Sequence, residues 1–246
     1  MRTGDSSSTS SNGPDKLAEP QTASGAIGAA LAGRRSIRAF LPTTVSREVI
    51  GRILDVSRRA PSASNMQPWK AHVLTGAARD RLSAALLEAH DAGVPAQREY
   101  DYYPQTWREP YLARRRAVGW QLYEAIGIGK GDRAASKRHH GRNYQFFGAP
   151  VGLIFSLDKD LGRGSLIDFG MFLQSIMIAA RGEGLETCPQ AALANYPHIV
   201  RQQLGIPDSE MILCGMSLGH ADLSAPENSF TADREPVENF TRFHME

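Results

Sequence analysis

Three arginines and a serine within five residues are the part of this chain best suited to bind an anion. Arg34, Arg35, Ser36 and Arg38 place three guanidiniums around one hydroxyl, and the planar forks of guanidiniums match the oxygens of a phosphate. Clustered arginines can also form a solvated charge run. The extended stretch at residues 39–42 would hold the guanidiniums in place, which favours the phosphate site.

A second polar segment follows further along the chain. Residues 61–69 read Pro-Ser-Ala-Ser-Asn-Met-Gln-Pro-Trp, a set of turn formers and hydrogen-bonding side chains beside one indole. Such a platform suits a planar heterocycle with polar edges, although a polar loop with an aromatic anchor has the same composition. A phosphate cradle and a heterocycle platform together predict a ligand like flavin mononucleotide (FMN).

Hydrophobic periodicity predicts the elements that position these two segments. The spacing of Val49, Ile50 and Ile53 predicts a helix that Ser46 caps and that ends before Pro61. The platform therefore begins where this helix ends. The other predicted elements are strands at 70–75, 151–157 and 211–218 and helices from 76, at 165–181 and at 197–204. The helix at 165–181 is apolar on nearly every side, so we place it in the core or against another subunit.

Size and composition indicate an ordinary globular protein. The 246 residues are 41% hydrophobic and 22% charged, enough for one domain, which we place at residues 25–246. Residues 1–24 are rich in Ser, Thr and Gly and are predicted to be a disordered leader. A net charge of +2 is too small to favour nucleic acid or a membrane surface as partner, and no apolar run is long enough for a membrane span.

The two cysteines, Cys188 and Cys214, show neither a paired motif nor a secretory leader. We interpret them as reduced, buried thiols, which predicts a cytoplasmic protein. His139 and His140 are adjacent, so their side chains do not converge on one ion, and we interpret them as surface residues with no metal site. The motifs of common serine hydrolases, zinc proteases and nucleoside triphosphatases are absent from the sequence.

The two polar segments resemble those of the nitroreductase family of flavin enzymes. That family has an N-terminal Arg, any residue, Ser, any residue, Arg or Lys and then an apolar residue, and its next loop carries Pro-Ser, Asn and Gln-Pro-Trp. The resemblance covers roughly residues 27–242 and includes two weaker matches, a small-residue turn with a proline at residues 187–191 and Arg234. Gln190 and Ala191 stand where many relatives have Glu-Gly, and Ala232 where they have a second basic residue.

The resemblance implies a role for each matching residue. Arg34, Ser36 and Arg234 would bind the phosphate, and Arg35 would assist through its backbone. Arg38 would lie near the pyrimidine edge, where positive charge stabilises the reduced flavin. The complete set of FMN contacts that we expect is Arg34, Arg35, Ser36, Arg38, Pro61, Ser62, Ala63, Asn65, Gln67, Pro189, Gln190, Ala191 and Arg234.

The fold and activity are likewise implied by the resemblance. We expect an α+β fold, with a mostly antiparallel central sheet wrapped by helices, in an intertwined homodimer with two FMN sites at its interface. The 61–69 loop of one subunit would cover the FMN of the other. NADH or NADPH would reduce the FMN, which would then reduce a nitroaromatic or quinone-type acceptor in a ping-pong mechanism. Since the flavin carries the chemistry, no catalytic side chain is expected.

Three alternatives remain open. The first is another reaction of the same superfamily, such as reductive dehalogenation or oxygen-dependent flavin cleavage. The second is a flavin-binding protein without turnover, and the third is an interaction domain without a cofactor.

Residues 92–148 form an excursion rich in aromatic and cationic side chains. Tyr102, Tyr103, Trp107 and Trp120 are either helix-packing residues or the lid of a substrate pocket. The run Arg114-Arg115-Arg116 is interpreted as a solvated face, and contact with the phosphates of a nicotinamide coenzyme is the alternative.

Overall fold

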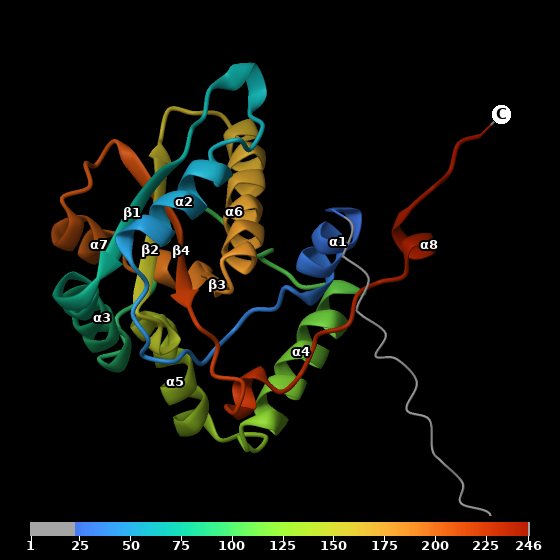
Figure 1. Ribbon diagram of the computed structural model, residues 1–246. Coiled ribbons are helices and arrows are strands. Elements are labelled where there is room, and N and C mark those ends of the chain that lie inside the picture. Colours follow the sequence, from blue (N-terminus) through green and yellow to red (C-terminus); the bar gives the residue numbers. More distant parts are fainter. Residues whose placement is uncertain (1–22, 246) are drawn as a thin grey trace, which may run out of the picture.

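Within residues 23–245, which the computed structural model describes, the core of the protein is a four-stranded antiparallel sheet with helices on both faces (Figure 1). The strands follow the order β1-β2-β4-β3. This confirms the predicted α+β class with an antiparallel sheet. The elements are α1 (Ala23–Gly33), α2 (Arg47–Ser57), η1 (Ala63–Asn65), β1 (Lys70–Thr75), α3 (Gly76–Asp91), α4 (Tyr111–Ala125), α5 (Arg133–Gly141), η2 (Arg142–Gly148), β2 (Val151–Asp158), α6 (Gly164–Gly182), β3 (Glu186–Gln190), η3 (Ala191–Ala194), α7 (Pro197–Leu204), β4 (Glu210–Gly219), η4 (Pro226–Asn228) and α8 (Val237–Phe240).

Local sequence signals place most of these elements. The Ser46 side chain accepts a hydrogen bond from the Val49 N–H (3.3 Å) at the start of α2, as the N-cap prediction required. Pro197 opens α7, and Gly205 ends it at φ 66°, a left-handed conformation that glycine adopts without strain. Nearly all of the predicted leader, residues 1–22, lies outside the described residues, and α1 begins at Ala23.

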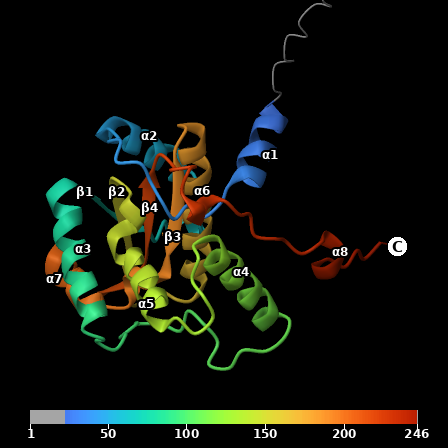
Figure 2. The same cartoon turned by 90° about the horizontal axis from the view of Figure 1, so that it is seen from below.

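The sheet separates two hydrophobic cores. Side chains alternate along β2, so Leu153 and Phe155 face α2 and α6 whereas Ile154 faces α3. Figure 2 shows the sheet between these two layers of helices. In β2, all seven residues from Val151 to Leu157 are buried, which confirms the prediction of a central strand covered on both faces.

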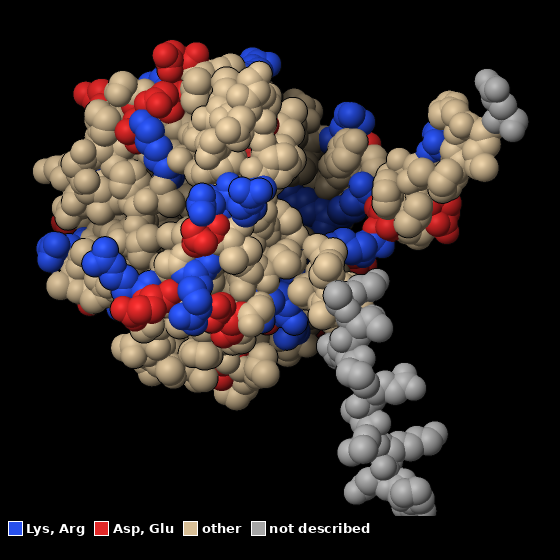
Figure 3. Space-filling model, turned by 45° about the horizontal axis from the view of Figure 1, so that its top comes forward, with Lys and Arg blue, Asp and Glu red and all other residues tan. Residues whose placement is uncertain are grey.

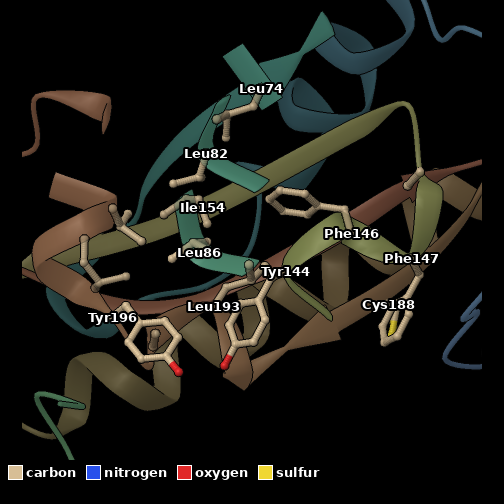
Figure 4. Packing of buried hydrophobic residues seen from close by; sticks show 14 of the residues in the cluster. Leu74, Leu82, Leu86, Tyr144, Phe146, Phe147, Ile154, Cys188, Leu193 and Tyr196 are labelled. Carbon is tan, nitrogen blue, oxygen red and sulfur yellow. The ribbon is translucent and has the colours of Figure 1, made fainter. Parts of the chain in front are cut away.

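Aromatic rings fill much of each core. On the α6 side, Phe155 lies edge-on to Phe169, with ring centroids 5.9 Å apart. On the α3 side, Leu82 and Leu86 of α3 meet Ile154 of β2, and Phe146 packs beside them (Figure 4). These contacts fix both helix layers to the sheet that carries the candidate site.

The excursion at residues 92–148 contains α4, α5 and η2. No residue of α4 is buried, and Figures 1 and 2 show α4 standing off the sheet. The C-terminal arm with α8 projects away from the sheet in the same region (Figure 1). In residues 23–245, no helix is long and apolar enough to span a membrane.

Candidate functional site

The arginine segment runs beside strand β3. Ser36 forms an isolated parallel bridge with Thr187, and the Ile37 N–H donates to the Thr187 carbonyl (3.1 Å). Ile37 is 1% exposed and anchors the segment in the core. Because side chains alternate along extended backbone, Ser36 and Arg38 face away from Ile37. The side chains of Ser36 and Arg38 therefore project from a backbone that Ile37 holds in place.

The structure brings this segment and Arg234 to one cavity of ≈ 280 Å³. The four arginines and Ser36 all line it, together with Val118 of α4 and Phe230, and no acidic residue does. The surface view shows Lys and Arg side chains gathered in the recess between the body and the projecting C-terminal arm (Figure 3).

The four guanidiniums of this cavity have no acidic partner among residues 23–245. The Arg35 guanidinium donates to the Asn228 carbonyl (3.0 Å) and that of Arg38 to the Ser36 carbonyl (3.3 Å). The Arg234 guanidinium donates to the carbonyls of Ala232 and Asp233, each at 2.9 Å. None of the described ion pairs includes an arginine of this cavity. A cavity lined by four cations without a counter-charge is suited to an anion with several oxygens, such as a phosphate.

Asn228 is a positioning residue that the sequence analysis missed. It is 5% exposed, its side-chain oxygen accepts from the Arg38 N–H (2.8 Å), and its amide nitrogen donates to the carbonyls of Ala39 and Asp222. These bonds join the arginine segment to the chain that leads to Arg234. No local signal could have revealed this, since the partners are about 190 positions apart.

The platform loop lies at the opposite end of α6. The Ala63 N–H donates to Asp168 (3.2 Å) near the start of α6, whereas Gly33, next to Arg34, lies against Arg181 in its last turn. Arg181 follows Asp168 by thirteen residues, and at a rise of ~1.5 Å per residue these two positions of α6 lie about 20 Å apart. One chain therefore does not bring the loop and the arginine cavity together.

The platform loop is exposed and has an unusual backbone. Ser64, Asn65 and Gln67 have φ values of 49°, 56° and 50°, in the left-handed region that costs non-glycine residues energy and that concentrates at functional sites. The Gln67 N–H donates to the Ser62 hydroxyl (3.0 Å), which holds the turn. Pro61, Ala63, Asn65 and Gln67 are exposed, and Ser62 is half-buried.

The segment at residues 187–191 is not the turn that the sequence analysis predicted. Residues 187–190 belong to β3, and Ala191 begins η3. Proline lacks an N–H, and β3 tolerates Pro189 because it is an edge strand. Gln190 is 3% exposed, and its side chain donates to the Asn143 carbonyl (2.8 Å) and accepts from the Ser217 hydroxyl (2.6 Å). The Gln190 side chain is therefore held by bonds within the protein.

A second cavity, of ≈ 250 Å³, adjoins this end of β3. Pro189, Gln190 and Ala191 line it, as do Tyr100 and Tyr102 from the excursion. The Tyr100 hydroxyl donates to the Leu213 carbonyl (2.6 Å), and burial raises its pKa. Tyr100 is therefore a neutral wall of the cavity.

The aromatic residues of the excursion divide into two groups. Tyr102 contacts Tyr103, with ring centroids 4.8 Å apart, and Tyr103 contacts Trp107 at 5.6 Å. Of these three residues, Tyr102 lines the β3 cavity and the other two do not. Trp120 lines a different cavity, with Arg115, Arg116, Gly119 and Tyr123.

The prediction of two surface histidines is wrong for His139. Its side chain is half-buried, and burial, helped by the charges of Arg142 and Arg38, lowers its pKa to about 4. Its ring lies edge-on to Tyr123, which covers part of the ring.

Cys188 and Cys214 are free buried thiols, and burial raises the pKa of Cys188 to about 11 and that of Cys214 to about 12. Residues 23–245 contain no group of three or more His, Cys, Asp or Glu side chains that could hold a metal ion.

Comparisons with known proteins agree on one family. The family model described as "Nitroreductase family" matches residues 31–220. The chain is 45% identical to a 4-nitrobenzoate reductase of Pseudomonas putida, over 87% of this chain and 94% of the relative. It is 44% identical to a nitrobenzene nitroreductase of Ectopseudomonas oleovorans, over 85% of this chain and 93% of the relative.

A solved structure gives the same result. The FMN-dependent nitroreductase NfnB from Mycobacterium smegmatis, solved in complex with NADPH, superposes with a TM-score of 0.86 at 32% identity. The match covers 90% of this chain and 99% of that protein.

Proposed function

The chain belongs to the nitroreductase family, and from that premise we propose that it is an FMN-dependent enzyme that uses NADH or NADPH to reduce nitroaromatic or quinone-type acceptors. Bound FMN would supply the redox chemistry, as it takes a hydride from the nicotinamide coenzyme and delivers electrons to the acceptor in a separate half-reaction. The chain's own residues bind the cofactor, orient it and line the pockets for its two substrates.

The observation that carries the proposal is the cavity of four arginines without a carboxylate. A phosphate monoester brings roughly −1.5 to −2 charges at neutral pH, which would balance guanidiniums that otherwise repel one another. Arg34, Ser36 and Arg234 would hold this phosphate, while Arg35, fixed by its bond to Asn228, adds charge. Ser36 pairs with Thr187, which lies four positions before Ala191, about 13 Å along extended backbone. An FMN whose phosphate is bound at Ser36 can extend as far as Ala191, which would place its ring beside Pro189, Gln190 and Ala191.

Arg38 would act on the ring rather than on the phosphate. It is the last arginine of the segment, and its backbone is held by Asn228 (2.8 Å). A fixed positive charge near the pyrimidine edge would stabilise the negative charge that reduction places there. The cavity with Tyr100 and Tyr102 beside Ala191 would receive the flat acceptor, which fits its apolar and aromatic walls.

We further propose that the enzyme is an intertwined homodimer with FMN at the interface. The support is that the platform loop and the arginine segment contact positions of α6 that lie about 20 Å apart along the helix, since a second copy could bring its loop to the first cavity. Exposed apolar side chains also favour a second copy as partner: Ile167 of α6 is 70% exposed, and Phe240 and Phe243 of the C-terminal arm are 69% and 76% exposed. In such a dimer, Pro61, Ser62, Ala63, Asn65 and Gln67 would contact the FMN of the other subunit.

Nitroaromatic compounds are the acceptors that we expect to react best. The relatives named above are reductases of 4-nitrobenzoate and of nitrobenzene, and the aromatic wall of the β3 cavity suits a benzene ring. A cytoplasmic location agrees with the two free thiols and with a coenzyme of central metabolism.

The test is a visible absorption spectrum of the purified protein, followed by steady-state oxidation of NADPH and NADH with nitrobenzene, 4-nitrobenzoate and a quinone. We expect a yellow protein whose flavin bleaches anaerobically on addition of coenzyme and regains colour with a nitroaromatic. A protein that stays colourless in excess FMN would overturn the proposal. A coloured protein that no coenzyme bleaches would instead be a flavin-binding protein without turnover.

A further inference from the structure

The cavity on the outer side of α4 has a chemistry that the FMN cradle and the β3 cavity do not explain. Arg115, Arg116, Gly119, Trp120 and Tyr123 line a volume of ≈ 290 Å³. Two of these five side chains are cationic, two are aromatic and none is acidic. Since α4 buries no residue, packing in the core does not account for this arrangement.

The three consecutive arginines of α4 have different surroundings. Arg114 pairs with Glu235 (Nε to Oε1, 2.8 Å). The guanidinium of Arg115 lies 4.7 Å from the ring centroid of Trp107, which holds it over the aromatic face. Among residues 23–245, neither Arg115 nor Arg116 forms a hydrogen bond or ion pair through its side chain. The two arginines at the cavity are thus the two whose charge is not neutralised.

Gly119 creates the space between these side chains. A glycine inside a helix costs about 1 kcal/mol relative to alanine, and the backbone of Gly119 is not among those with positive φ. A Cβ at this position would have nothing within 4 Å. Neither packing nor backbone conformation requires a glycine here, and Gly119 lines the cavity without a side chain that would project into it.

A series of aromatic contacts lies between this cavity and the end of β3. Arg115 stacks on Trp107, Trp107 contacts Tyr103 (5.6 Å), and Tyr103 contacts Tyr102 (4.8 Å), which lines the cavity at Pro189 and Ala191. The α4 cavity and the β3 cavity therefore border the same cluster of aromatic side chains.

We propose that the α4 cavity binds the adenosine 2′-phosphate end of NADPH and makes the enzyme prefer NADPH to NADH. This inference rests on the proposed function. Trp120, with 48% of its surface exposed, offers an indole face on which a purine stacks. Arg116 and Arg115 bind the 2′-phosphate, which NADH lacks, through charge-assisted hydrogen bonds. A nucleic acid is a poor alternative, because the net charge is only +2.

The first test compares coenzymes in variants of the FMN-loaded enzyme. Arg116→Ala should lower kcat/KM for NADPH by about 10- to 100-fold, as expected for one hydrogen bond to a charged group, and leave kcat/KM for NADH unchanged. Gly119→Leu, which fills the cavity but keeps both arginines, should weaken both coenzymes. Arg114→Ala is the matched control, because Arg114 pairs with Glu235 and does not line the cavity; its NADPH-to-NADH ratio should equal that of the wild type.

The second test does not depend on turnover. Adenosine 2′,5′-bisphosphate is titrated into the protein with calorimetry and Trp fluorescence as readouts, and AMP, which lacks the 2′-phosphate, is the comparison ligand. The wild type should bind the bisphosphate at least ten times more tightly than AMP, whereas Arg116→Ala should bind the two ligands about equally. Binding of the bisphosphate to the wild type should also quench the fluorescence of Trp120. Equal affinity of the wild type for both ligands would overturn the inference.

The two tests separate this inference from the proposed function. An active enzyme whose NADPH-to-NADH ratio is the same in the wild type and in Arg116→Ala would refute the α4 site alone. A wild type that oxidises neither coenzyme would refute the proposed function, and the bisphosphate titration would still decide whether the α4 cavity binds a 2′-phosphate. Because Arg116 is exposed, its removal should not disturb folding.

Discussion

Arg38 is the arginine of the cavity that we expect to change the midpoint potential of bound FMN and not only its affinity. Its backbone is fixed by Asn228, and it shares the cavity with the three arginines that surround it. Arg38→Ala should weaken the binding of reduced FMN more than that of oxidised FMN, by about 1.5–3 kcal/mol, the range for a hydrogen bond to a charged group. For a two-electron couple this lowers the midpoint potential by about 30–65 mV.

Potentiometric titration of the bound flavin measures this shift. Arg47→Ala, which removes an exposed arginine outside the arginine cavity, is the control and should leave the potential unchanged. If the Arg38 variant has the midpoint potential of the wild type, Arg38 does not stabilise the reduced flavin.

His139 makes the stability of the fold depend on pH. Burial and the charges of Arg142 and Arg38 lower its pKa from 6.5 to about 4, so the unfolded chain binds a proton between these values that the folded chain does not. The contribution of neutral His139 to the free energy of unfolding is therefore fully present above pH 6.5, and it is lost as the pH decreases from 6.5 towards 4.

His139→Gln should reduce this loss. Thermal unfolding at pH 7.5 and pH 5 should give a smaller difference in Tm for the variant than for the wild type, by a few degrees for a change of about 1 kcal/mol. The same decrease in both proteins would show that His139 does not stay neutral in the folded state.

At the residue level the sequence identified the arginines and missed their support. A guanidinium cluster with an interleaved serine has a recognisable chemistry, so Arg34, Ser36 and Arg38 could be singled out without a structure. Asn228 could not, because a lone asparagine in a polar stretch has the same local signature whether or not it bonds to distant backbone groups.

At the level of elements, prediction succeeded where periodicity is strong. The helix after Ser46, the strand at residues 151–157 and the long apolar helix are all present. Strand β3 was missed, because the resemblance to the family implied a turn at residues 187–191 and the strand has only five residues. Its pairing with β4 is a long-range contact that local propensity does not encode.

Gly215 shows how tightly β4 fits between its neighbours. A Cβ at this position would collide with the Leu193 side chain and lie 2.8 Å from the Leu153 carbonyl oxygen. Gly215→Ala should therefore force a backbone shift and destabilise the protein by about 1–3 kcal/mol, seen as a lower Tm.

Gly51→Ala is the matched control for this substitution. Gly51 lies in α2 with nothing within 4 Å of the added atom, and alanine favours a helix over glycine. Its Tm should equal or exceed that of the wild type, and a Gly215 variant with an unchanged Tm would contradict the close packing at β4.

At the scale of the whole molecule, α6 determines what one chain can and cannot do. The platform loop lies against its first turns and the arginine cavity near its last, so a single chain carries both halves of the proposed FMN site without joining them. The sequence suggested the dimer only through resemblance to a family, because the distance between the two halves is a property of the folded chain.

Coexpression of two defective chains tests whether two subunits share each FMN site. One chain carries Arg34→Glu and Arg234→Glu in its cradle, and the other carries Ser62→Ala and Asn65→Ala in its loop. Each alone should form dimers that bind FMN poorly. In mixed dimers one of the two sites combines an intact cradle with an intact loop, so random assortment restores FMN to about a quarter of all sites. If the coexpressed chains assemble together but bind no more FMN than either variant alone, the shared site is wrong.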